Sequence, residues 1–298
     1  MIPVLLGVYT LVFVLMRSTP GGPWDFSDRP LTEAAIKSLN ERFNLDQPLY
    51  RQYVDYIWGI VTRFDFGPSY RNTTQSVRQI IAQFFPVSAQ LGLAAMILAV
   101  LAGTSLGVVS ALFPNTWVDY LAVLFSIIGI SIPVFVITPI LVVIFAIWLG
   151  WLPTGGWEGL FSRTAILPVF VLALAPTAAL ARYTRASMLE ITRMDYVRTA
   201  RAKGLRERII LLRHIIPNAM IPITTVVGVY LAFVVTGSFF VETILRIPGI
   251  GRYFVTSIQA RDYPVILGTT LLLAFLVTTI NLVVDLLYGV LDPRIRYE

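Results

Sequence analysis

Cysteine is absent from this sequence of 298 residues, and histidine occurs once, as His214. Without cysteine there is no disulfide, no zinc–thiolate site and no thiol catalysis. A single histidine cannot build a histidine-based metal site alone, and we expect His214 to make a structural contact within its loop. We therefore expect neither a metal site nor a bound cofactor.

Charge is also scarce, because only 13% of the residues are charged and 56% are hydrophobic. A soluble globular domain carries about 25% charged residues. Together with several long apolar runs, this composition predicts an all-α membrane protein that crosses the bilayer repeatedly. The net charge of +6 is concentrated in one loop and a short tail. Membrane orientation explains this distribution better than nucleic-acid binding does.

Signatures of catalysis are missing as well. The sequence has no GxxxxGK[ST] phosphate loop, so we do not expect the chain to bind ATP in that manner. An intramembrane enzyme would need a nucleophile with a histidine, or paired aspartates, within the apolar runs, and Asp119 and Asp285 lack that context. No cleaved signal is expected either, because residues 1–16 lack a basic start and an A-x-A-like cleavage site.

Six apolar runs predict six transmembrane helices. The first is about 24 Å long as a helix, slightly short for a hydrocarbon core of about 30 Å. The third is expected to be one long span that bends at Ile132-Pro133 and Pro139. In the second, Gly103 and Gly107 form a small-xxx-small pair that allows close helix packing. The expected spans are residues 1–16, 86–113, 117–149, 165–181, 221–242 and 264–290, the last five forming a permease domain over 86–298.

Residues 17–85 form the one long polar segment, which we predict to be an extracytoplasmic domain between the first two spans. Segments of this length cross membranes with little regard to charge. Thr32 and Glu33 indicate the start of one short helix. Residues 50–64 predict a second, amphipathic helix rich in tyrosine and tryptophan. The segment is either a packed cap over the outer mouth or a docking surface for an external partner.

The most basic segment is the loop 182–217, which holds nine arginines and lysines against three acidic residues. A cation-rich loop between spans marks the cytoplasmic face, so six spans place both termini there too. Asp195 to Ile209 has an amphipathic helical pattern in which Gly204 should end a first helix. A second helix should follow, with a further bend at Pro217 and Asn218. The loop either docks a soluble partner or holds anionic lipid headgroups.

This loop resembles that of ABC-transporter permease subunits in the dipeptide, oligopeptide and nickel branch. The branch pattern YVRTARAKGL is met by 196–205, and RHxxxNAxxP is met at Arg213, His214, Asn218, Ala219 and Pro222. The more general loop pattern is matched only at Ala200, Gly204 and Pro217. Further signatures resemble the branch at 44–53, 149–156, 247–252, 261–265 and 291–296, so the resemblance covers most of the chain.

The resemblance implies a permease subunit of an ATP-driven importer in the cell membrane, not an enzyme. Its substrates would be di- or oligopeptides, or alternatively nickel or another small solute. Its implied partners are a second homologous permease, two cytoplasmic ATPases, an extracytoplasmic binding protein and membrane lipid, with no nucleic acid. The implied ATPase-coupling residues are Asp195, Tyr196, Thr199, Ala200, Arg201, Lys203, Gly204, Arg213 and Asn218.

A stand-alone channel or secondary carrier is the competing class. Such carriers usually show internal repeats and buried charges at mid-membrane, and neither is clear here. Dependence on a separate ATPase separates the two classes.

Three residues are candidates for the translocation pathway, Pro133, Glu242 and Asp262. Pro133 lies in the segment 129–139, where a broken helix would line a cavity or be buried in protein. Glu242 could bind a substrate amine near the outer mouth, or pair with Arg246 four residues on. Asp285 is expected to pair with Arg294 or Arg296 in the tail.

Overall fold

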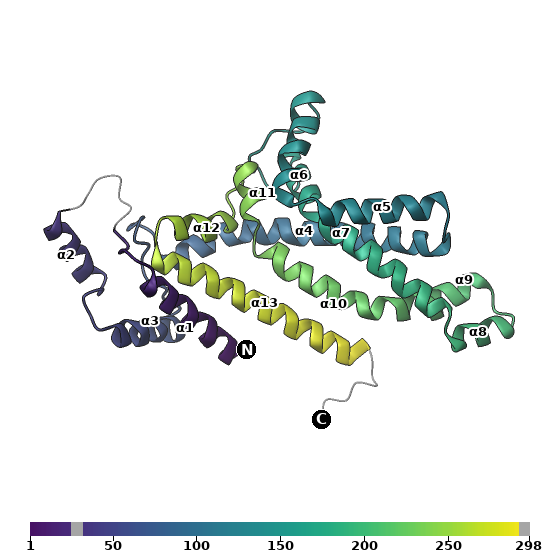
Figure 1. The fold of residues 1–298 in the computed structure, drawn as a ribbon, viewed down its shortest axis with the longest axis horizontal. Coiled ribbons are helices and arrows are strands. Elements are labelled where there is room, and N and C mark those ends of the chain that lie inside the picture. The colour runs from purple at the N-terminus through teal and green to yellow at the C-terminus, as the bar shows by residue number, and fades with distance from the viewer. Residues whose placement is uncertain (25–31, 292–298) are drawn as a thin grey trace. The chain divides into compact units, whose positions relative to one another are not determined.

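The computed structural model describes residues 1–24 and 32–291, and within them the chain is helical with a single isolated β-bridge between Pro68 and Ser76. The chain divides into two compact units (Figure 1). Unit 1 comprises Met1–Ser88, Thr236–Phe239 and Pro248–Leu276, and unit 2 comprises Ala89–Val235, Phe240–Ile247 and Val277–Glu298.

Unit 1 is built around the first apolar helix and the beginning of the last one. Its helices are α1 (Ile2–Ser18), α2 (Glu33–Arg42), α3 (Leu49–Arg63), the start of α4 (Val77–Leu112), α12 (Gly251–Gln259) and the start of α13 (Tyr263–Leu291). The Thr32 side chain accepts a hydrogen bond from the Ala35 amide and so caps α2. Both short helices predicted between the first two spans are confirmed.

The core of unit 1 joins α1 to the first turns of α13. Tyr9, Phe13 and Met16 pack against the α13 residues Tyr263, Ile266 and Leu267. A second buried cluster joins the start of α4 to the segment before α12 and to α13, through Val77, Ile80, Phe84, Ile250 and Val265. The segment 243–263, between the last two expected spans, thus contains a packed helix, α12.

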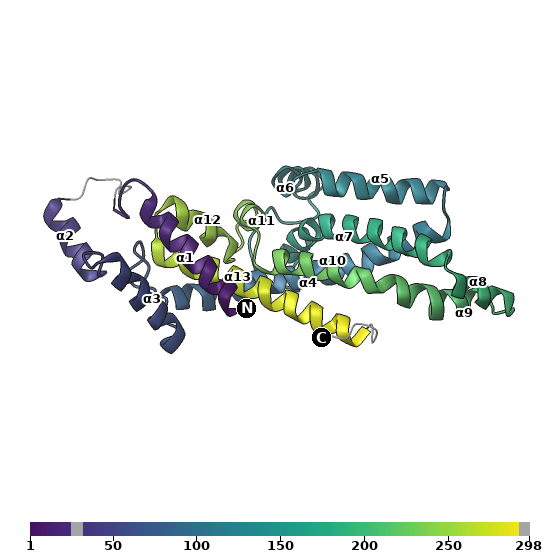
Figure 2. The ribbon, with the colours of Figure 1, turned by 60° about the horizontal axis from the view of Figure 1, so that its bottom comes forward.

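Unit 2 holds the remaining long helices (Figures 1 and 2). In chain order they are the rest of α4, α5 (Trp117–Ser131), α6 (Val134–Leu141), the π-helix η1 (Val142–Trp148), α7 (Arg163–Thr192), α8 (Asp195–Ala202), α9 (Glu207–Ile210), the π-helix η2 (Leu211–Ile215), α10 (Ile216–Val235), α11 (Phe239–Ile244) and the rest of α13. Its core lies where α7 packs against α5 and α10.

The small-xxx-small pair in α4 allows a close helix approach, as predicted, and the helix that packs on it is α7. A Cβ added to Gly103 would lie 2.7 Å from the carbonyl oxygen of Thr177. One added to Gly107 would lie 2.6 Å from the carbonyl oxygen of Ala181. Real Cβ atoms do not come this close to backbone, so only glycine allows the two helices to approach in this way.

Four helical stretches of the described chain are long and apolar enough to cross a membrane: Val77–Leu112, Arg163–Thr192, Glu207–Ile244 and Tyr263–Leu286. The pair Trp117–Ser131 and Val134–Trp148 adds a fifth if it counts as one span, and Ile2–Ser18 is a shorter apolar helix. Helices run past two predicted boundaries, because α4 begins at Val77 with Pro86 inside it and α7 continues to Thr192.

The third apolar run breaks at the predicted place, but it is not one kinked helix. Its two halves meet at 108°. Ile132 is extended, with φ −88° and ψ 118°, and Pro133 caps the second half. Proline supplies no amide hydrogen and disfavours helical backbone in the residue before it, which explains the break. Pro139, the other expected bend, lies inside α6 without interrupting it.

Candidate functional site

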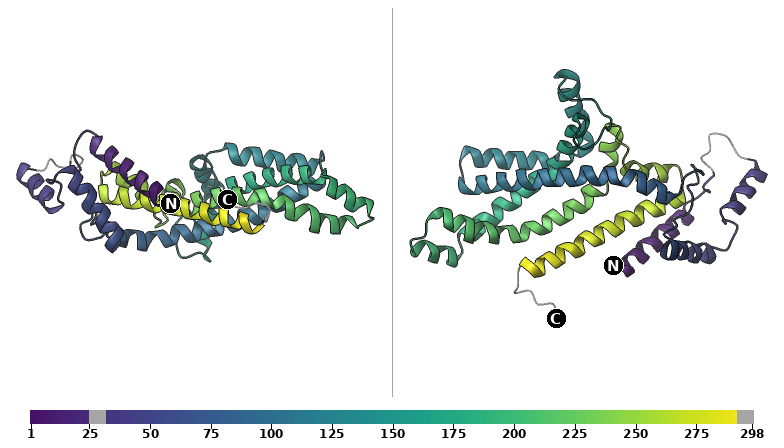
Figure 3. Two further views of the ribbon diagram at one scale, coloured as in Figure 1. Left: turned by 90° about the horizontal axis from the view of Figure 1, so that it is seen from below. Right: turned by 180° about the vertical axis from the view of Figure 1, so that it is seen from behind.

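The basic segment folds into a helical hairpin, α8 and α9, which follows the end of α7 and leads into α10 (Figures 1 and 3). Gly204 closes α8 with φ +74°. The Leu205 amide donates to the Ala200 carbonyl at 3.3 Å, and the Gly204 amide donates to the Arg201 carbonyl at 2.9 Å. These two bonds form a Schellman motif, in which glycine adopts the left-handed conformation without strain. The predicted role of Gly204 as a helix terminator is confirmed.

One face of α8 anchors the hairpin to the long helices. Val197 is fully buried and Ala200 is 5% exposed. Both belong to an apolar cluster with Met188 of α7, Ile210 of α9, Ile215 of η2 and Ala219 of α10. Because this cluster includes residues of both α7 and α10, α8 is packed on two long helices at once.

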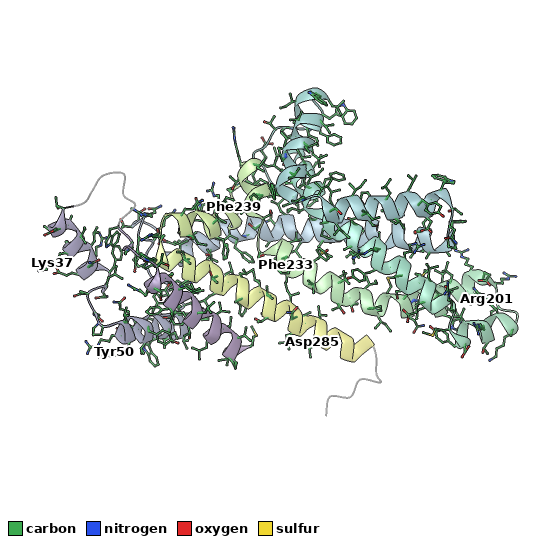
Figure 4. The ribbon with its side chains drawn as sticks, viewed as in Figure 1. Lys37, Tyr50, Arg201, Phe233, Phe239 and Asp285 are labelled. Carbon is green, nitrogen blue, oxygen red and sulfur yellow. The ribbon has the colours of Figure 1, made fainter. Side chains whose placement is uncertain are left out.

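The opposite face of α8 is exposed and strongly polar. The Arg201 guanidinium contacts Glu207 across the turn at 2.9 Å, and Arg198 lies 3.5 Å from Asp195. Arg201 is labelled in Figure 4. Exposed pairs of this kind contribute at most about 1 kcal/mol, so these side chains are available to a partner. Of the predicted coupling residues, Asp195, Tyr196, Thr199, Arg201, Lys203 and Gly204 are exposed and Ala200 is buried.

The second arm of the hairpin differs from the predicted form. Pro217 and Asn218 do not interrupt the helix, because η2 continues directly into α10. The Asn218 side-chain amide donates to the His214 carbonyl at 2.7 Å. Proline has no amide hydrogen to give to the preceding turn. Pro217 is the second residue of α10 and lies directly after the π-helical turn, so the helix continues through it. Arg213 and Asn218 are both exposed on this arm.

A buried ion pair near the hairpin joins elements that the sequence patterns did not connect. The Arg185 guanidinium on α7 donates from Nε to Asp119 Oδ1 at 2.6 Å and from Nη2 to Oδ2 at 2.7 Å. The Asn115 amide donates to the same carboxylate at 2.9 Å, and Ser110 donates to its other oxygen. Arg185 was counted among the loop cations. Asp119 is the only charged residue in the apolar run 117–149, which is the one signal that could have suggested a partner.

The three pathway candidates have different surroundings. Pro133 lies at the break between α5 and α6. Glu242 lies in α11 and is 1% exposed. Beside it, the Gly156 amide donates to the Leu245 carbonyl at 2.7 Å, which brings the 149–156 signature next to α11. The expected pair of Asp285 with the tail lies outside the described residues.

Asp262 organises a turn in unit 1. Its carboxylate accepts hydrogen bonds from the Tyr70 amide at 3.0 Å, from the Arg71 amide at 3.3 Å and from the Ser69 hydroxyl. Asp262 is buried, with 4% of its surface exposed. Burial raises the pKa of the neighbouring Tyr70 hydroxyl to about 12. This geometry supplies a structural role for Asp262, and its place in a pathway stays a prediction.

Comparisons with known proteins give consistent matches. Residues 103–297 match the family model described as binding-protein-dependent transport system inner membrane component. The dipeptide transport system permease protein DppB of Bacillus subtilis is 44% identical over 292 residues, which cover 98% of this chain and 94% of the relative. The oligopeptide transport system permease protein OppB of Escherichia coli is 43% identical, covering 99% of this chain and 96% of the relative.

A solved structure shares the fold. The MetNI methionine ABC transporter, in inward-facing conformations, has a chain that aligns with a TM-score of 0.56 at 17% identity. The alignment covers 72% of this chain and 96% of that chain. At this identity the likeness shows the fold of an ABC importer permease and no more.

Proposed function

The chain belongs to the family of binding-protein-dependent transport system inner membrane components, and on that premise we propose that it forms the import pathway for di- or oligopeptides together with a second, homologous permease. Like its relatives, it is a multi-pass membrane permease, and it is not an enzyme. ATP hydrolysis takes place in two separate cytoplasmic ATPases, and an extracytoplasmic binding protein delivers the substrate.

The observation that carries the coupling role is the two-sided construction of α8. Its apolar face packs on α7 and α10, and its polar face is exposed and makes only weak ion pairs with the described residues. A soluble ATPase that binds the exposed face would therefore displace a helix already packed on two long helices. Cations such as Arg198 and Lys203 favour an acidic surface on that partner. Closure of the ATPases would then tilt the packed helices between two arrangements.

The proposed topology has six spans with both termini in the cytoplasm. α1 forms the first span and the broken pair of α5 with α6 and η1 forms the third, which adds two to the four long stretches. The basic hairpin of α8 and α9 then lies on the cytoplasmic side. The break at Pro133 and the buried Glu242 are the proposed pathway positions. Backbone that leaves a helix at membrane depth occurs where it is buried in protein or lines a cavity.

A cysteine-free chain permits a direct test of the coupling role. Thr199→Cys places a single thiol on the exposed face of α8, and Lys37→Cys places one on α2 as a matched exposed control. A thiol-to-amine crosslinker should join Thr199→Cys to the ATPases in purified complexes and leave Lys37→Cys unattached. Crosslinking to lipid amines alone would show that the hairpin holds headgroups and would overturn the coupling role.

Transport itself is tested with the reconstituted complex. We expect proteoliposomes that contain the ATPases and the binding protein to accumulate a labelled dipeptide only when ATP is supplied on the ATPase side. Uptake of nickel instead of the peptide would show that the transporter imports the alternative substrate. Uptake by this chain alone, without the ATPases, would identify a stand-alone carrier or channel.

A further inference from the structure

α3 presents an apolar face that no described part of the chain covers. Tyr50, Val54, Trp58 and Val61 are 69%, 55%, 64% and 70% exposed. Their spacing of four, four and three residues places them on one side of the helix (Figure 4 labels Tyr50). Four large exposed apolar side chains in one stripe mark an interaction surface rather than scattered surface residues.

A second face of α3 packs on the two apolar helices of unit 1. The Tyr9 hydroxyl of α1 donates to the Tyr53 carbonyl at 2.9 Å, and Thr10 and Tyr53 share a hydrogen bond of 2.8 Å between their hydroxyls. The Tyr56 hydroxyl donates to the carbonyls of Phe66 and Pro264, the latter in the first turn of α13. Tyr53, Tyr56 and Ile57 also pack on the core that joins α1 to α13.

These contacts set the depth of α3. Tyr9 precedes Arg17, the first charged residue of α1, by eight residues, which is about 12 Å along a helix. The first described turns of α13, which α3 also contacts, begin a stretch that is apolar enough to cross a membrane. α3 therefore lies alongside the apolar part of α1 and against the first turns of α13.

The third face of α3 is polar. Arg51, Asp55 and Thr62 are exposed and lie on one side of the helix. With about 100° between successive residues, the exposed apolar face lies between the other two faces, about 85° from the polar face and about 100° from the packed face. A helix at the edge of a bundle needs these three faces when it lies in the membrane interface, because it then meets water, protein and lipid. Tyr50 and Trp58 are also the residue types enriched at that level.

We infer that α3 is an interfacial helix that lies in the leaflet at the Tyr263 end of α13, with Tyr50, Val54, Trp58 and Val61 in contact with lipid. The lipid surface continues from α1, where Leu11, Val14 and Leu15 are 61%, 52% and 58% exposed. No charged side chain interrupts the α3 stripe. The segment 17–85 is then partly embedded in the membrane and is not a domain held wholly in water.

Spin labels attached to single cysteines test this placement in the complete transporter in lipid nanodiscs. Val54→Cys and Val61→Cys are small changes on the exposed apolar face, and Asp55→Cys is the control on the polar face of the same helix. Labels at 54 and 61 should collide with oxygen, which dissolves in lipid, several-fold more often than with a water-soluble nickel chelate. The label at 55 should show the reverse preference, and each variant should retain transport.

Two results overturn the inference. Free access of the nickel chelate to 54 and 61 would place this face in water. Exclusion of both reagents would show that a protein covers the face, either the binding protein or the second permease. Omitting the binding protein and repeating the measurement separates those two partners.

Discussion

Arg185 of α7 holds Asp119 of α5, 66 residues earlier in the chain, through two hydrogen bonds of 2.6 and 2.7 Å. The Asp119 side chain is 2% exposed and that of Arg185 is 27% exposed. Ser110 near the end of α4 and the Asn115 amide donate to the same carboxylate. One buried carboxylate thus joins α4, the following turn, α5 and α7 at a single point.

Removing one partner of this pair should destabilise the protein more than removing both. Arg185→Met leaves the buried carboxylate without its counter-charge, and breaking such a pair costs about 3 kcal/mol. The double variant Asp119→Ala/Arg185→Met should lose less than the sum of the two single changes. Thermal unfolding of all four proteins in the same detergent measures the coupling. Strictly additive losses would mean that the pair contributes nothing beyond its separate parts.

The glycine contacts between α4 and α7 should be sensitive to a single methyl group. Gly107→Ala places a Cβ 2.6 Å from the Ala181 carbonyl oxygen and 2.5 Å from the Thr184 Cβ. We expect it to lower stability by about 1–3 kcal/mol, because added atoms in a packed contact force the helices apart. Gly7→Ala in α1 is the matched control, because nothing lies within 4 Å of its added Cβ. Equal melting temperatures for the two variants would contradict the close approach.

Substitutions at Gly204 should separate the shape of the turn from contact with a partner. A Cβ added to Gly204 would meet nothing within 4 Å. The free-energy cost of a side chain there therefore comes only from the left-handed backbone conformation. That cost is about 1–2 kcal/mol for most residues and smaller for asparagine. We expect Gly204→Asn to keep the melting temperature while Gly204→Leu lowers it. Loss of ATP-driven uptake in both would show that a partner approaches the glycine closely. Normal uptake in both, at normal expression, would count against the docking role of this turn.

Unit 1 should lose stability at high pH through Tyr70. Burial raises the pKa of its hydroxyl from 10 to about 12, and the Asp262 carboxylate adds to this while Arg17 opposes it. Because the folded pKa is the higher one, the stabilisation is fully present below pH 10 and is lost as the pH rises from about 10 through about 12. Tyr70→Phe should reduce the fall of the melting temperature over this interval. An unchanged pH profile would show that Tyr70 does not titrate with unfolding.

Local patterns predicted the hairpin well, because its determinants lie within a few residues of one another. The spacing of Val197 and Ala200 indicates the buried face of α8, and Gly204 indicates its end. Helix boundaries were less predictable, since hydropathy reports where apolar sequence stops and not where a helix stops. α7 therefore continues to Thr192 through residues that were assigned to a loop, and Pro86 lies within α4 instead of starting it.

The tertiary partners could not be predicted from spacing. Asp119 and Arg185 are 66 residues apart, and Asp262 lies 192 residues from Tyr70. No local period links such residues, so Asp119 was left without a role and Asp262 was placed in the pathway. The break at Pro133 was predictable because the chemistry of proline acts on its own neighbour. The angle of 108° between the two halves depends on packing with other helices, so it was not predictable from the sequence.

The position of the α4 contact along α7 gives that helix the proportions of a lever. Thr184, which meets Gly107, lies eight residues from the α8 end of α7 and twenty-one from Arg163. At about 1.5 Å per residue the two arms are roughly 12 Å and 32 Å long. If the small-residue contact acts as the fulcrum, a sideways displacement imposed at the hairpin would be enlarged between two- and threefold at the far end of α7. Pro168 and Pro176 lie in the long arm, where any bending would absorb part of that gain.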